Sequence, residues 1–245
     1  MSKSLDQLPA DPSKLYLHYT TTHELVEDPY SETLQRWDVS VRHPGAADAD
    51  RRIPTPQAPP DDVGQETEIG RMEFYRVRLD QGMNASTAME EESEELEQIA
   101  RALLHPDGYL TAEASERLSY VGTDLLVMDR VVLTMPWRGF GLGAVLAAEA
   151  INRLAPGCRA VACIPGIADP DGSWRPDQVE WDRVTAKITA GWERVGFTHF
   201  RDTVYLLDPA TGALEDQRSR LRSEYLQMCL GWKSTSAAGT GGDDQ

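Results

Sequence analysis

Residues 125–154 read LLVMDRVVLTMPWRGFGLGAVLAAEAINRL, and the elements that they predict indicate the fold class. Its first ten residues are mostly apolar and end at Thr134, which predicts a buried strand. Pro136 then stops regular structure, and glycines follow at positions 139, 141 and 143. Beyond them, apolar residues recur at the spacing of one helix face until Ala155-Pro156-Gly157 ends the helix. The stretch therefore predicts a strand, a basic glycine-rich turn and a helix.

The predicted turn has the chemistry of an anion site. Its glycines lack β-carbons, so backbone N–H groups can approach a ligand closely. The unpaired N–H groups and the dipole of the following helix favour negative charge at the same place. Arg138 adds a guanidinium fork that suits phosphate. An ordinary connection between strand and helix is the alternative, but Arg138 beside alternating glycines favours a phosphate or pyrophosphate cradle.

Two other phosphate motifs fit the turn less well. Gly139, Gly141 and Ala144 formally match the dinucleotide fingerprint. However, Met135 to Arg138 separate the strand from the first glycine, whereas the dinucleotide turn follows its strand directly. The acidic residue expected about twenty positions further on is absent. A Walker loop needs Gly-Lys-Ser/Thr, which does not occur here, so an NAD(P)-dependent oxidoreductase and a P-loop protein are both disfavoured.

The turn resembles a family signature. Arg138-Gly139-Phe140-Gly141-Leu142-Gly143 is similar to the Arg-x-x-Gly-x-Gly motif of the GNAT superfamily of acyl-CoA-dependent N-acyltransferases. Downstream, Trp192-Glu193-Arg194-Val195-Gly196-Phe197 resembles the Tyr-x-x-x-Gly-Phe segment of that family. The two motifs stand in family order, and the resemblance covers roughly residues 68–207.

The resemblance implies a fold and a cofactor. The fold would be α/β, with a mixed, splayed central sheet flanked by helices on both faces, which the alternation of strands and helices also predicts. Acetyl-CoA would lie in the notch of the sheet, with its pyrophosphate on the turn and its pantetheine arm along the preceding strand. The cofactor-binding residues implied in this way are Val131, Val132, Leu133, Arg138, Gly139, Phe140, Gly141, Gly143 and Ala144.

The function implied is an N-acetyltransferase that moves an acetyl or other acyl group from acetyl-CoA directly to an amine of a small molecule or peptide. A non-catalytic sensor or scaffold that binds acyl-CoA is the alternative. Release of CoA in the presence of amines distinguishes the two functions.

Asp129 is the preferred candidate for the catalytic base. Strand alternation predicts that its side chain leaves the same face as Val131 and Leu133. A carboxylate in an otherwise apolar strand favours a raised pKa, although an ion pair with a neighbouring arginine is an equally good structural explanation. Glu73, in an earlier predicted strand, is the second candidate base.

At the position of the family's general acid, this sequence carries a different residue. Trp192 stands where many members carry a tyrosine, and an indole N–H is not a comparable proton donor. Trp192 also completes the apolar stripe of its predicted helix, which favours core packing. Tyr205 or a water molecule is then the candidate acid.

The composition of the chain bears on its partners, its location and its use of metals or disulfides. The chain has 245 residues, 40% of them hydrophobic, and a net charge of −16, which disfavours nucleic acid as a partner. No signal peptide and no apolar run of membrane-spanning length are apparent, and the three cysteines (Cys158, Cys163 and Cys229) form no disulfide or metal pattern. We expect a cytoplasmic protein without metal. The oligomeric state stays open, a homodimer being one option.

The chain divides into three parts. Residues 1–64 form an N-terminal extension and a proline-rich linker that starts near His43, residues 65–232 form the acyltransferase-like domain, and residues 233–245 form a flexible tail. Besides the central strand and helix, the patterns predict strands at Glu66–Leu79, Arg159–Ile164, Phe197–Phe200 and Thr203–Leu207, and helices at Ala85–Leu104, Trp181–Val195 and Leu214–Leu230.

Overall fold

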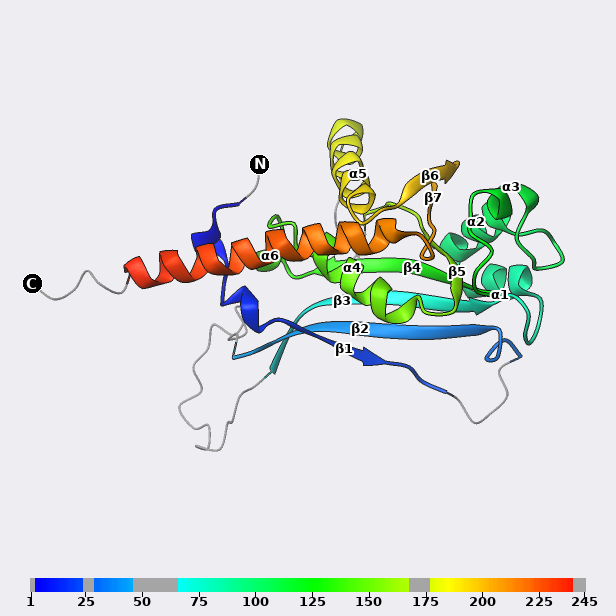
Figure 1. Ribbon diagram of the computed structural model, residues 1–245, viewed down its shortest axis with the longest axis horizontal. Helices are drawn as coiled ribbons and strands as arrows, with labels where there is room; N and C mark the ends of the chain where they lie inside the picture. The colour runs from blue at the N-terminus through cyan, green and yellow to red at the C-terminus, as the bar shows by residue number, and fades with distance from the viewer. Residues whose placement is uncertain (1–2, 24–28, 46–65, 168–176, 240–245) are drawn as a thin grey trace, which may run out of the picture.

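A computed structural model describes residues 3–23, 29–45, 66–167 and 177–239. These ranges form an α/β fold in which one mixed, seven-stranded sheet has helices on both faces (Figure 1). The expected mixed sheet with flanking helices is therefore confirmed.

The strands follow one another across the sheet in the order β1-β2-β3-β4-β5-β7-β6. Every neighbouring pair is antiparallel except β4 and β5, which are parallel and are joined by the crossover helix α4 (Leu142–Leu154). The strands are β1 (Tyr16–Thr20), β2 (Leu34–Pro44), β3 (Glu66–Arg78), β4 (Asp124–Leu133), β5 (Cys158–Cys163), β6 (Thr198–Arg201) and β7 (Val204–Leu207).

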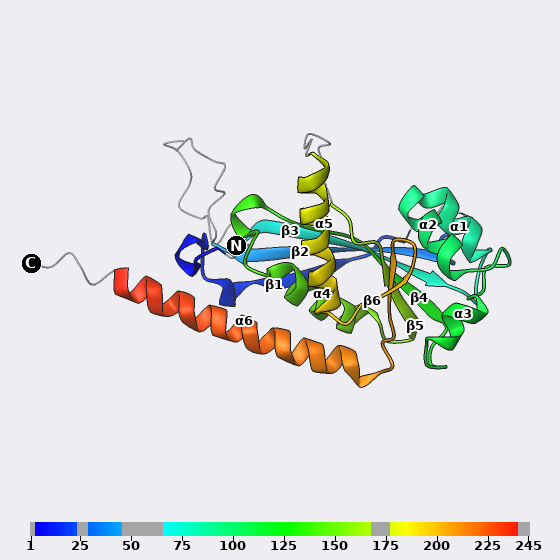
Figure 2. The same cartoon turned by 90° about the horizontal axis from the view of Figure 1, so that it is seen from above.

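Helices from different parts of the chain cover the two faces of the sheet. One face carries α1 (Ala85–Glu92), α2 (Glu94–Leu103) and α3 (Ala112–Glu116), and the other carries α4 and the long α6 (Gly212–Gly239). Figure 2 shows α6 running beside α4, where Arg218 and Arg222 both form ion pairs with Glu149. Short 3-10 turns lie at Leu5–Gln7 (η1), Pro12–Lys14 (η2) and Met135–Trp137 (η3).

The alternation of β4 divides the buried side chains between two cores. Leu126 and Met128 pack with α4, whereas Leu125 and Val127 pack with α2. All four are at most 2% exposed. Burial of each such side chain contributes about 1.5–3 kcal/mol, so β4 holds both layers together.

Two predicted helices differ in extent from the observed ones. The helix predicted over Ala85–Leu104 is divided into α1 and α2 at Ser93, which is extended (φ −163°, ψ 160°) and caps α2 by accepting a hydrogen bond from Leu96 N–H. The last helix was predicted to end at Leu230, but α6 continues to Gly239. Residues 234–239, predicted as part of a flexible tail, are thus helical.

The N-terminal segment contributes to the sheet. Residues 1–42, predicted only as part of an N-terminal extension, include β1 and most of β2. All of β1 pairs with residues 38–42 of β2, and β2 pairs with β3 along almost its whole length. Because β2 runs to Pro44, the start of the predicted linker is strand, and His43 is only 2% exposed. The remainder of the predicted linker, residues 46–64, lies outside the described residues.

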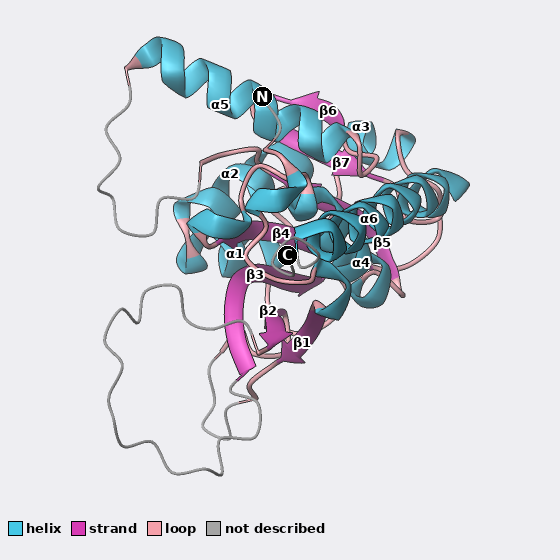
Figure 3. Cartoon of the chain, turned by 90° about the vertical axis from the view of Figure 1, so that its left-hand side faces the viewer, coloured by secondary structure: helices cyan, strands magenta, loops and turns pink. Residues whose placement is uncertain are grey.

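Helix α5 (Gln178–Glu193) projects from the body of the molecule (Figure 3). The predicted helix is present, but none of its residues is buried, and Trp181 is 44% exposed. Residues 165–177, which precede α5, have the proline and glycine content of a polar loop, and residues 168–176 of this segment lie outside the described ranges. Within those ranges, no helix combines the length and apolarity needed to cross a bilayer.

Candidate functional site

Only the first half of β4 is paired with β5. The parallel register begins at Asp124 and Cys158 and ends at Met128 and Cys163. On its other side, β4 stays paired with β3 as far as Leu133, which lies opposite Gly70. Residues 129–133 therefore form an open half of β4, which has β3 on one side and, among the residues that the structure describes, no strand on the other.

Two backbone N–H groups point toward this open side. Thr134 N–H donates a hydrogen bond to Ile69 O of β3 at 2.8 Å. Because N–H directions alternate along a strand, the backbone N–H of Val132 also points toward β3, whereas the N–H groups of Val131 and Leu133 point away from β3. Of the three predicted backbone contacts, Val131 and Leu133 have the direction that a ligand beside β4 requires.

The turn after β4 has the backbone geometry that its glycines permit. Gly139 and Gly141 have φ values of +91° and +81°, in the left-handed region that favours glycine. Gly141 is the N-cap of α4 and supplies no side chain to cap its N–H groups. A Cβ added at Gly143 would meet no atom within 4 Å. Within the described ranges, no side chain therefore caps the N–H groups of Leu142, Gly143 and Ala144 at the start of α4.

Basic groups border this turn. Arg138 is exposed, and its Nε donates to Leu133 O at 2.5 Å, so its stem turns back over the open half of β4. Arg194, which follows α5, places Nη1 3.9 Å from the position that a Gly141 Cβ would take, and its guanidinium also pairs with Glu224. Phe140 packs against the core on the α4 face, and Ala144 is buried in it. The turn combines free N–H donors with cations, as a phosphate group requires.

Asp129 occupies a β-bulge at the point where β4 and β5 separate. Phe74 lies opposite Met128 and Glu73 lies opposite Arg130, so Asp129 is the extra residue. The predicted alternation is therefore wrong here. Val131 and Leu133 join the core on the α4 face, whereas Asp129 lies near Glu73 and Glu95 on the side of α1 and α2. One inserted residue reverses the side-chain parity along the strand.

The Asp129 carboxylate is largely withdrawn from water. Its side chain is 8% exposed, and its nearest cation is Arg130, whose Nε lies 3.6 Å away. Burial raises the pKa of Asp129; the Arg130 charge opposes this rise, and the Glu73 and Glu95 charges add to it. The net pKa shift is upward, the direction that suits a general base near neutral pH.

Glu73, the second candidate base, is already engaged. Its carboxylate pairs with Arg36 of β2 at 2.6 Å and accepts a hydrogen bond from the Tyr75 hydroxyl at 3.3 Å. The Tyr75 hydroxyl has a single proton, which it shares between Glu73 and the closer Glu92 carboxylate at 2.9 Å. Arg36 and Tyr75 were not among the residues predicted from the sequence. The two-residue spacing that puts Glu73 and Tyr75 on one strand face was a signal for Tyr75, whereas the sequence holds no such signal for Arg36.

Tyr205 and Trp192 lie on the other face. Tyr205 is opposite Cys163, the last β5 residue that pairs with β4, so it lies at the level where the sheet opens. Both Tyr205 and Trp192 pack against the core on the α4 face, away from Asp129. The half-buried Trp192 fits the predicted packing role. The structure brings Asp129 and Glu73 together on one face of the sheet and places Tyr205 on the other face.

No protein-family model, curated protein or solved structure matches the chain. In the described part of the chain, no group of three or more histidine, cysteine or acidic side chains is arranged to hold a metal ion. The three cysteines are buried and free. Functional inference therefore depends on the geometry of this site.

Proposed function

We propose that the protein is an acyl-CoA-dependent N-acyltransferase with a GNAT-like fold, which transfers an acetyl group from acetyl-CoA to an amine of a small molecule or peptide. One observation carries the proposal. The open half of β4 leads directly into a glycine turn and an uncapped helix N-terminus, so an edge for an extended amide-containing arm adjoins an anion cradle. Coenzyme A has these two parts in the same order.

The residues around the opening fit such a molecule. Val131 and Leu133 offer backbone N–H groups to the pantetheine amides or to the thioester carbonyl. Leu142, Gly143 and Ala144 offer N–H groups to the diphosphate, and Arg138 and Arg194 add positive charge. Acetyl-CoA would supply the activated acyl group as a thioester. The sheet order and the parallel β4–β5 pair, which ends midway, support the splayed sheet that this fold requires.

The chemistry assigned to the chain has three steps. Asp129 accepts a proton from the acceptor ammonium, because a protonated amine has no lone pair for attack. A β4 N–H group stabilises the carbonyl oxygen as the C–N bond forms. As the C–S bond breaks, Tyr205 or a water molecule donates a proton to the departing thiolate, and it regains a proton from the attacking nitrogen, which loses its second proton as the amide forms. The upward pKa shift of Asp129 and its position at the bulge support its role.

A non-catalytic acyl-CoA-binding protein is the second candidate. It is favoured by Trp192, which replaces the tyrosine of the resembled motif, and by the absence of hydrogen-bonded contact between Tyr205 and Asp129 among the described residues. Under this proposal the cradle and the open edge would bind the cofactor, and the carboxylates would serve only the fold.

Binding and turnover separate these proposals. Thermal unfolding is measured with acetyl-CoA, CoA, NADP and ATP, because a ligand at about a hundred times its Kd stabilises the fold by about 2.7 kcal/mol. CoA release is then measured with a panel of amines, using wild type, Asp129→Asn and, as a matched control, Asp38→Asn in β2. Turnover that Asp129→Asn alone lowers supports the enzyme. Binding without turnover supports the second candidate, and no stabilisation by CoA or acetyl-CoA contradicts both.

A further inference from the structure

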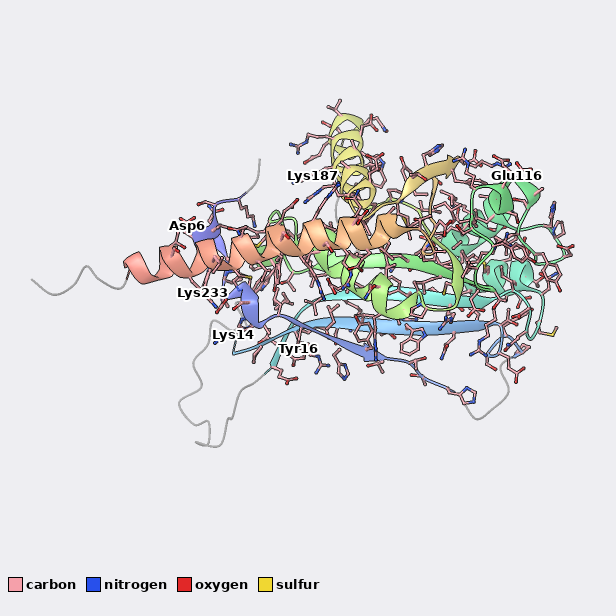
Figure 4. The ribbon with its side chains drawn as sticks, in the orientation of Figure 1. Asp6, Lys14, Tyr16, Glu116, Lys187 and Lys233 are labelled. Carbon is pink, nitrogen blue, oxygen red and sulfur yellow. The ribbon has the colours of Figure 1, made fainter. Side chains whose placement is uncertain are left out.

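The N-terminal arm, residues 3–15, is fixed against α6. Leu5 packs where α6 carries Gly231; a Cβ at that glycine would lie 2.7 Å from Leu5 Cδ1. The Tyr225 hydroxyl of α6 donates a hydrogen bond to Pro12 O. Figure 4 shows Asp6 and Lys14 on the arm beside the part of α6 that carries Lys233. The arm thus has a defined course along the helix.

This course brings Lys3 onto the glycine turn. Its backbone N–H donates to Gly139 O at 3.5 Å, and its Nζ donates to Met135 O at 3.3 Å. Nζ also lies 5.4 Å from the centroid of the Phe140 ring. The Lys3 stem covers Gly139 so closely that a Cβ there would lie 3.4 Å from Lys3 Cγ. A residue 135 positions before Arg138 in the chain therefore shares its turn.

Three cations from separate segments border the turn that precedes α4. They are Lys3 from the arm, Arg138 from the turn and Arg194 from the end of α5. Arg194 is paired with Glu224, but among the described residues neither Lys3 nor Arg138 has a carboxylate within ion-pair distance. The chain carries 40 acidic and 24 basic residues. Unpaired cations at a helix N-terminus of such an acidic chain indicate an anionic ligand.

We propose that Lys3 is a cofactor-binding residue that donates to a phosphate group of acyl-CoA, so that the N-terminal arm forms one wall of the cofactor site. The proposal rests on the acyl-CoA function proposed above. Lys3 Nζ leaves the Met135 carbonyl and binds a phosphate oxygen, while its stem stays packed on Gly139 and Phe140. The shared chemistry is a phosphate dianion or diester of the nucleotide, either the diphosphate or the 3′-phosphate.

The test measures Kd by calorimetry on the full-length protein. The ligands are acetyl-CoA, 3′-dephospho-acetyl-CoA and S-acetylpantetheine, which lacks phosphate. The variants are Lys3→Ala, Lys3→Arg and, as a control on the same arm, Lys14→Ala. We expect Lys3→Ala to bind acetyl-CoA about ten-fold to a hundred-fold more weakly, the loss typical of one charge-assisted contact. Lys3→Arg should retain most of the affinity, and Lys14→Ala should equal wild type.

The comparison of the three ligands identifies the phosphate group that Lys3 contacts. A loss that persists with 3′-dephospho-acetyl-CoA places Lys3 on the diphosphate, and a loss that disappears with it places Lys3 on the 3′-phosphate; both support the proposal. Equal affinity of wild type and Lys3→Ala for acetyl-CoA overturns it, as does an equal loss with S-acetylpantetheine. If wild type binds no CoA species, the proposed function itself fails. The two failures are therefore distinguishable.

Discussion

A substitution at Gly141 tests the backbone geometry of the turn, because the φ of this residue sets the expected change in the free energy of unfolding. Its φ of +81° is left-handed, and a side chain in that region costs about 1–2 kcal/mol. A Cβ at Gly141 would make an ordinary contact, 3.9 Å from Arg194 Nη1, and no closer one. Gly141→Ala should therefore lower the free energy of unfolding by about 1–2 kcal/mol through the backbone alone.

Gly143→Ala is the matched control. The same methyl group is added two residues later, inside α4, where no atom lies within 4 Å of the new Cβ and φ is not positive. Alanine is preferred to glycine in a helix by about 0.5–1 kcal/mol, so this variant should be more stable than wild type. The two variants should differ by about 1.5–3 kcal/mol, or about 3–12 °C in Tm for a domain of this size.

Urea unfolding followed by far-UV circular dichroism and tryptophan fluorescence measures the difference. Coincident transitions from the two probes establish that the free energies are comparable. If both variants unfold at the same urea concentration, or if Gly143→Ala is the less stable, the left-handed geometry assigned to the start of α4 is wrong.

Four further predictions concern the candidate site and the residues that support it. Asp129→Asn should lower turnover by about 10²–10⁴-fold and leave the Kd of acetyl-CoA unchanged. Because the pKa of Asp129 is raised, its ionised form destabilises the folded state, so Asp129→Asn should be more stable than wild type at pH 7. In urea unfolding at a series of pH values, this gain should be lost as pH falls through the raised pKa of Asp129 and should be absent once pH is below the ordinary aspartate pKa of about 3.9. Arg76→Met breaks a largely buried ion pair with Asp124 (2.7 Å) and should cost about 2–3 kcal/mol, against less than about 1 kcal/mol for the exposed Arg71→Met, by the same assay. If Tyr205 protonates the thiolate, Tyr205→Phe lowers turnover without affecting cofactor Kd; an unchanged rate assigns that proton to water.

Much of the central architecture could be predicted from the sequence. The apolar run before Thr134, the glycines after Pro136 and the helical spacing up to Leu154 correspond to β4, the turn and α4. Strong periodicity and unambiguous breaking residues made this possible. The closing hairpin was also predicted; Asp202 at its tip has φ +50°.

The features that the sequence concealed depend on long-range pairing. The bulge at Asp129 appears only when β3 and β4 are aligned, because nothing in the local sequence marks an extra residue. Likewise, the N-terminal segment gains its place from the pairing of β1 with β2 and of β2 with β3, and Lys3 gains its place from packing of the arm on α6. Local propensity carries no information about such partners.

The amino-acid sequence after β5 keeps the gap beside the open half of β4 from closing. If β5 continued in its register beyond Cys163, Pro165 would lie opposite Arg130 and Gly166 opposite Val131. Proline has no N–H to donate to a ladder, and glycine is a poor strand former, so the two strands cannot close along their full length. The opening is therefore preorganised, and no part of a ligand's binding free energy is consumed in separating the strands.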